Sequence, residues 1–144
     1  MYENILIPVD GSDEAEKGIK HGIELAAAVG ATVHGLYVIE EGGNPWLNEP
    51  MDDQMDSARE YGNDITGSVA DRAADAGVES VTAVEVGTDV AKKINEYAVE
   101  EGNDVIVMGS GYKGKIGSLL GSTAEKVLRS SEIPVITLRR TQDS

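Results

Sequence analysis

The sequence predicts an α/β fold built on one open parallel sheet with helices on both faces. Short apolar runs alternate with segments of helical periodicity along the 144 residues. The first run, 4–10, is apolar nearly throughout, which is typical of a strand buried on both faces of a parallel sheet. The connections are short, and strict alternation of strands and helices favours right-handed crossovers within one sheet.

The first strand, at 4–10, leads into an amphipathic helix. Ser12 or Asp13 can cap the first turn of this helix, apolar residues recur along it at helical spacing, and Gly30 can end it. The next apolar run predicts a second strand at 31–40.

A loop is expected at 41–50, where Gly, Pro and Asn are frequent. A long helix from about 51 to 77 should follow, weakened or broken around Gly62 and Gly67. The alternating pattern of 78–87 predicts a third strand that is less deeply buried than the others.

The last third of the chain repeats the alternation. Thr88 or Asp89 can cap a third helix, and a continuous apolar run at 104–110 predicts the fourth strand. A fourth helix is expected at 122–131 and a fifth strand at 133–140. Strands and helices therefore alternate along the whole chain, which begins and ends with a strand and has five strands and four helices in all.

Composition limits the class of partner. Acidic residues number 26 and basic residues 12, which gives a net charge of −14. Because phosphate contacts need basic surface, this balance argues against nucleic acids and anionic membranes as partners. The protein is expected to come from a cytoplasm of high salt concentration, because its carboxylates are dispersed, its apolar side chains are small and its lysines are few. An ordinary acidic cytosolic protein is the alternative.

No apolar run is long enough to cross a membrane. Met1 leads directly into the first strand without a basic segment, so no secretion signal is expected. Cysteine is absent, which leaves no disulfide or catalytic thiol and fits a cytoplasmic protein. With no internal repeat or linker, residues 1–144 are expected to form one domain.

The segment between the fourth strand and the fourth helix, "GSGYKGKIGSLLGST", is longer and richer in glycine than a connection requires. Backbone N–H groups at a helix start favour anions, and glycine lets a phosphate approach the backbone. Lys113, Lys115 and the hydroxyls of Ser122 and Thr123 add to a phosphate cradle. The spacing is neither a P-loop nor the dinucleotide fingerprint. The alternative is a surface loop before a capped helix.

The first strand ends in "PVDGS", and its Asp10 is the second half of this hypothesis. Ligands of open parallel sheets bind at the carboxyl ends of the strands, where the strand order reverses. If the first strand neighbours the fourth, Asp10 faces the glycine segment. It then suits a ribose hydroxyl or a water molecule bound to magnesium. The alternative is that Asp10, Gly11 and Ser12 only form a turn and a helix cap.

At these residues the chain resembles a universal stress protein over essentially its whole length. The resemblance rests on "ILIPVDGS", "VEVGTDVAKKINEYA", "DVIVMGSG", "LLGSTAEKVL" and "IPVITLR". Nucleotide-binding members carry G-x2-G-x9-G-[ST] between the fourth strand and fourth helix. Gly111, Gly121 and Ser122 keep the second spacing, whereas Gly109 to Gly111 is one residue short. Either Gly111 serves as the second motif glycine, or Tyr112 stands there and the deletion lies further along. The first register is favoured.

The resemblance implies a Rossmann-like sheet of order 3-2-1-4-5, as in adenine nucleotide alpha hydrolase-like folds, and a site for ATP with Mg²⁺ or Mn²⁺. It also implies a homodimer through residues 133–140, whose apolar edge invites pairing. The implied contacts are Pro8, Val9 and the backbone near Val38 for adenine, Asp10 and Gly109 for ribose, and Gly111, Gly121, Ser122 and Thr123 for the phosphates, with Met108 also in the site.

Three functions remain open at this point. The favoured one is an ATP-binding, homodimeric stress sensor or regulator in the cytoplasm, with at most slow hydrolysis. The second is a family member that binds no nucleotide and acts as a protein-interaction module. The third, an efficient ATP-dependent enzyme, is disfavoured because no catalytic base or nucleophile set is evident. His21 and His34 are expected to be structural or surface residues.

Overall fold

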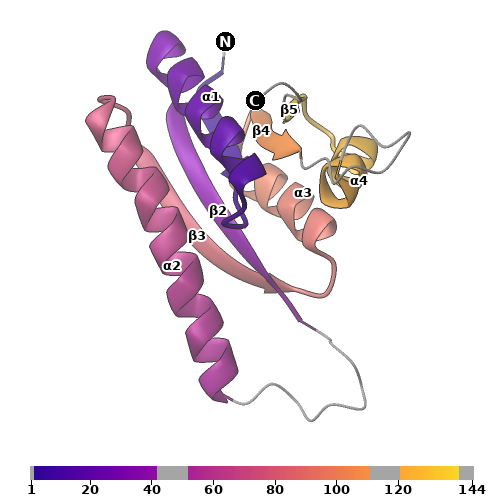
Figure 1. Cartoon of the computed structure of the whole chain (residues 1–144). Coiled ribbons are helices and arrows are strands. Elements are labelled where there is room, and N and C mark those ends of the chain that lie inside the picture. Colours follow the sequence, from indigo (N-terminus) through magenta and orange to yellow (C-terminus); the bar gives the residue numbers. More distant parts are fainter. Residues whose placement is uncertain (1, 42–51, 111–120, 140–144) are drawn as a thin grey trace.

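The computed structural model describes residues 2–41, 52–110 and 121–139, which form five strands and four helices in strict alternation (Figure 1). All strand pairs are parallel, and the strand order is β3-β2-β1-β4-β5, which confirms the predicted fold class. The elements are β1 (Asn4–Pro8), α1 (Asp13–Val29), β2 (Thr32–Glu40), α2 (Asp52–Asp75), β3 (Ser80–Gly87), α3 (Val90–Glu100), β4 (Val105–Ser110), α4 (Ser122–Ser130) and β5 (Val135–Arg139).

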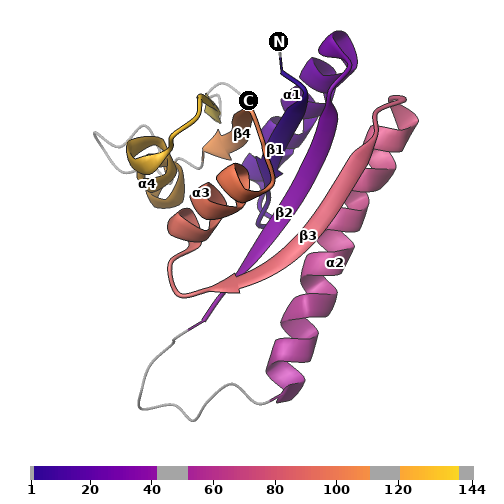
Figure 2. The ribbon, with the colours of Figure 1, turned by 180° about the vertical axis from the view of Figure 1, so that it is seen from behind.

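Two helices cover each face of the sheet. Figure 1 shows α1 and α2 on the near side, and the opposite view in Figure 2 shows α3 and α4 on the other. Strand β1 lies at the centre, where Ile5 is opposite Val33 of β2 on one side and Val105 of β4 on the other. Since β1 is covered on both faces, the side chains of Ile5, Leu6 and Ile7 are completely buried, as the continuous apolar run predicts.

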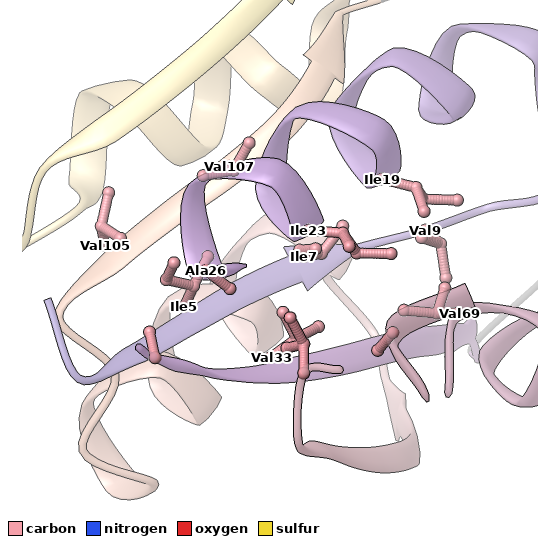
Figure 3. Close-up of a cluster of buried hydrophobic side chains, with 13 residues drawn as sticks. Ile5, Ile7, Val9, Ile19, Ile23, Ala26, Val33, Val69, Val105 and Val107 are labelled. Atoms are coloured by element: carbon pink, nitrogen blue, oxygen red, sulfur yellow. The ribbon is translucent and has the colours of Figure 1, made fainter. Parts of the chain in front are cut away.

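Alternate residues along the strands belong to two separate hydrophobic cores, one on each face of the sheet. The core beneath α1 and α2 contains Ile5 and Ile7 of β1 together with Ile23 of α1 and Val69 of α2 (Figure 3). The core beneath α3 and α4 contains Leu6 of β1 with side chains of β2, α3, β4 and α4. The period of two in the strands therefore assigns each apolar side chain to one of the two helical layers.

Helix α1 runs unusually close to the end of β4. A Cβ atom added to Gly18 would lie 2.5 Å from the backbone nitrogen of Gly109 and 3.0 Å from the carbonyl carbon of Met108. A Cβ atom on Gly109 would collide with the carbonyl of Glu14. Two glycines thus allow backbone contact between the start of α1 and the carboxyl end of β4.

The expected break in the second helix is wrong, because α2 runs without interruption from Asp52 to Asp75. Gly62 is required there by packing: an added Cβ atom would lie 2.5 Å from the ring of Tyr37 and 3.1 Å from Val84. The glycine lets α2 lie close against β2 and β3, and this tertiary packing outweighs the low helix propensity of the residue. Gly67 has open space around it.

The edges of the sheet are the two strands that the family resemblance implies. β3 forms one edge, and most of its residues are only half-buried. β5 forms the other edge and covers Val135–Arg139, within the expected range 133–140, of which residue 140 lies outside the described residues. None of the helices in the described part of the chain combines the length and apolarity needed to span a membrane.

Candidate functional site

A pocket of about 540 Å³ opens at the carboxyl ends of β1, β2 and β4. Nine of the ten residues predicted for the ligand site line it: Pro8, Val9, Asp10, Val38, Met108, Gly109, Gly121, Ser122 and Thr123. They come from four elements and their ends, and the pairing of β1 with both β2 and β4 brings them together. Gly111, together with Lys113 and Lys115, lies outside the described residues.

The turn after β1 forms the cap of α1 and also places Asp10 in the lining of the pocket. The backbone N–H of Ser12 donates to Oδ1 of Asp10 over 2.9 Å, and Oγ of Ser12 accepts from the N–H of Ala15 over 3.3 Å. Gly11 has φ of 82°, a left-handed conformation that favours glycine. The tripeptide is therefore a turn and a cap for α1, and the same turn holds the carboxylate of Asp10 at the mouth of the pocket.

One wall of the pocket is apolar and includes residues that the sequence did not reveal. Leu36 and Val38 of β2 contribute to it, and Val90 and Ile94 reach it from the first half of α3. Helical periodicity shows that Val90 and Ile94 share a face, but which layer that face meets depends on the crossover of α3. An apolar wall of this kind suits the faces of a planar aromatic ring.

The start of α4 forms another part of the pocket lining. Gly121 is the N-cap residue of this helix, with φ of −67° and ψ of 159°, and a glycine has no side chain with which to cap. Ser122 and Thr123 form the first turn and line the pocket. The N–H groups of this turn and the positive end of the helix dipole favour an anion beside them.

Gly109 has a structural role that the ligand hypothesis alone would not reveal. The side of Gly109 on which a Cβ atom would stand is occupied by the carbonyl of Glu14 in α1. The residue lines the pocket, yet its lack of a side chain is already required by the packing of α1 on β4. A glycine at this position is therefore consistent with a ligand but does not by itself indicate one.

The described lining is rich in negative charge. Three carboxylates, of Asp10, Glu14 and Glu125, line the pocket with one ammonium group, that of Lys126. Among the residues that the structure describes, no group of three or more His, Cys, Asp or Glu side chains gathers to hold a metal ion.

Both histidines lie outside the described lining of this pocket. His34 of β2 is 6% exposed, its Nε2 lies 3.1 Å from Oδ1 of Asn4, and its ring packs edge-on against Tyr97. Burial lowers the pKa of His34, an effect that Glu101 partly offsets. His21 lies on α1 and is half-exposed. These surroundings agree with the structural interpretation of both side chains.

Comparisons with known proteins agree with this architecture. The chain matches the model of the Universal stress protein family over residues 1–139. Universal stress protein MJ0531 of Methanocaldococcus jannaschii is 32% identical over 145 residues, which cover 97% of this chain and 84% of that protein.

Two solved structures share the fold over nearly the whole chain. The structure of hypothetical protein MJ0577, from the same organism, has a TM-score of 0.85 at 29% identity and covers 99% of each chain. The crystal structure of a universal stress protein in complex with cAMP has a TM-score of 0.73 at 25% identity and covers 97% of this chain and 98% of that one.

Proposed function

Because the chain belongs to the universal stress protein family, we propose that it binds an adenine nucleotide, ATP with Mg²⁺ or Mn²⁺, in the pocket between β1, β2 and β4. The observation that carries this proposal is the convergence of nine predicted ligand residues on one pocket of about 540 Å³. That volume is within the range of pockets for small molecules and cofactors. A relative in this family was crystallised in complex with cAMP, which also contains adenine and phosphate.

The pocket offers a different surface to each part of the nucleotide. The apolar wall of β2 and α3 would receive adenine beside Pro8 and Val9. The carboxylate of Asp10, held by the N–H of Ser12, would accept a hydrogen bond from a ribose hydroxyl. Ser122 and Thr123 would donate to the phosphates from the start of α4.

A divalent cation fits the charge of the site. The lining carboxylates would repel a bare polyphosphate, so a cation on the phosphates would reduce this repulsion. Asp10 is the residue that would hold the ion through water, since it lies at the end of β1 beside the ribose position.

The proposed role is that of a stress sensor or regulator with at most slow hydrolysis. No histidine, and hence no imidazole base, is among the described residues that line the pocket. A homodimer through β5 and a cytoplasmic location remain predictions from the sequence and the resemblance.

Isothermal titration with ATP, with and without Mg²⁺, tests the nucleotide site. We expect saturable heat, tighter binding with Mg²⁺, and a higher melting temperature in the presence of nucleotide. Asp10→Asn is the matching variant: it keeps the size and the turn but removes the charge, so it should weaken the benefit of Mg²⁺. Absence of both heat and thermal shift at millimolar ATP would contradict the proposal and favour the protein-interaction alternative.

A further inference from the structure

A buried hydroxyl group joins the two ends of the glycine-rich segment. Ser110 is the last residue of β4, and its side chain is completely buried. The backbone N–H of Gly121 donates to its Oγ over 3.0 Å, across eleven positions of the chain. This hydrogen bond connects the carboxyl end of β4 directly to the N-cap residue of α4.

The start of α4 differs from the starts of α1 and α3. In α1 the side chain of Ser12 accepts from the N–H of Ala15, and in α3 the carboxylate of Asp89 accepts from the N–H of Lys92. In α4 the N-cap residue is Gly121, which has no side chain to accept from its first turn. The helix therefore begins with N–H groups that its own N-cap side chain does not satisfy, and that turn lines the pocket.

The hydrogen bond to Ser110 also limits which N–H groups at the start of α4 are available to bind a ligand. The N–H of Gly121 is already engaged with Ser110, whereas Ser122 and Thr123 follow it in the first turn. Donors that are already held in position contribute more to the affinity for a phosphate, because less reorganisation is needed when the ligand binds. One buried bond at the N-cap would fix the position of this turn relative to β4.

We propose that Ser110 is a positioning residue for the phosphate half of the nucleotide site, and that it acts by holding the start of α4 against the end of β4. The inference rests on the proposed function of the pocket. The proposed contacts to adenine and ribose come from β1, β2, α3 and Gly109 of β4, and none of them comes from α4. A hydroxyl that holds the start of α4 should therefore affect only ligands that carry phosphate. A role in general stability would instead affect all ligands alike.

Ser110→Ala removes only the hydroxyl, and Ser131→Ala is its matched control at the other end of α4. Oγ of Ser131 donates to the carbonyl of Ile133 over 2.7 Å and accepts from its N–H over 3.1 Å, away from the pocket. We expect Ser110→Ala to bind ATP about tenfold more weakly, the loss of one hydrogen-bonded positioning contact, and adenosine within about twofold of the parent. Ser131→Ala should bind both ligands like the parent.

The outcomes separate this inference from the proposed function. If the parent binds ATP and Ser110→Ala keeps the parent's ratio of ATP to adenosine affinity, the positioning role is wrong and the nucleotide site stands. If the parent binds neither ligand, both fail. Amide hydrogen exchange without nucleotide supplies the second measurement: the Gly121 N–H should be protected in the parent and exchange faster in Ser110→Ala. An unprotected Gly121 N–H in the parent would also overturn the inference.

Discussion

The close contact between α1 and β4 gives a prediction whose size follows from the structure. In Gly18→Ala, the new methyl group would lie 2.5 Å from the nitrogen of Gly109 and 3.1 Å from Cα of Met108. Both are backbone atoms of β4, so no side chain can rotate away to make room. An outward shift of α1 by about 0.9 Å would be needed to bring 2.5 Å to the 3.4 Å at which ordinary contact begins.

Two opposing effects set the expected change in stability. Overpacking of this kind costs typically about 1–3 kcal/mol, and the upper end applies here because the neighbours are backbone. Alanine gains about 1 kcal/mol over glycine in a helix interior. The free energy of unfolding should therefore fall by roughly 2 kcal/mol, which corresponds to about 6 °C in melting temperature for a chain of this length.

Gly67→Ala in α2 is the matched control, because the same substitution there meets nothing within 4 Å. It should raise the free energy of unfolding by up to about 1 kcal/mol from helix propensity alone. Urea unfolding followed by circular dichroism, with the two variants and the parent in the same high-salt buffer, measures both changes. The reasoning about backbone contact would be refuted if Gly18→Ala were as stable as Gly67→Ala.

Three further predictions concern the ligand, the assembly and pH. Gly121→Val should weaken the binding of ATP by on the order of 2 kcal/mol in a calorimetric titration, because it places a side chain in the part of the pocket where the phosphates are proposed to bind; unchanged affinity would mean that the phosphates bind elsewhere. Val135→Lys on the β5 edge should convert the expected homodimer to a monomer in light scattering, whereas Val81→Lys on the exposed β3 edge should not. Burial lowers the pKa of His34 in the folded state despite Glu101, so the unfolded chain binds a proton more readily. Stability should therefore be intact above the ordinary pKa of about 6.5 and fall as the pH drops below it; urea unfolding of the parent and of His34→Gln should show a smaller fall for the variant, and equal falls would assign the effect to other groups.

The sequence by itself determined the order and type of the elements. Apolar runs such as 4–10 show burial on both faces because a strand alternates its side chains between two layers, and that information is local. The sequence narrowed the caps of α1 and α3 to two neighbouring residues each, because a cap acts on N–H groups within three residues of itself, and the structure assigns them to Ser12 and Asp89. The local pattern also predicted the turn at Asp10 and the glycine-rich start of the fourth helix with Ser122 and Thr123 as ligand-binding segments, whereas the adenine contacts Pro8, Val9 and Val38 came from the family resemblance.

Only the tertiary structure decided what depends on the approach of distant segments. Gly62, which was expected to weaken the second helix, lies against Tyr37 of β2, and Gly109, a predicted ligand contact that lines the pocket, also lies against the carbonyl of Glu14 in α1. The sequence also could not predict that α3 contributes to the pocket, or that the N–H of Gly121 donates a hydrogen bond to Ser110. Each of these contacts joins residues from different elements, and its distance is set by how helices and strands pack together, which a linear pattern of residue types does not record.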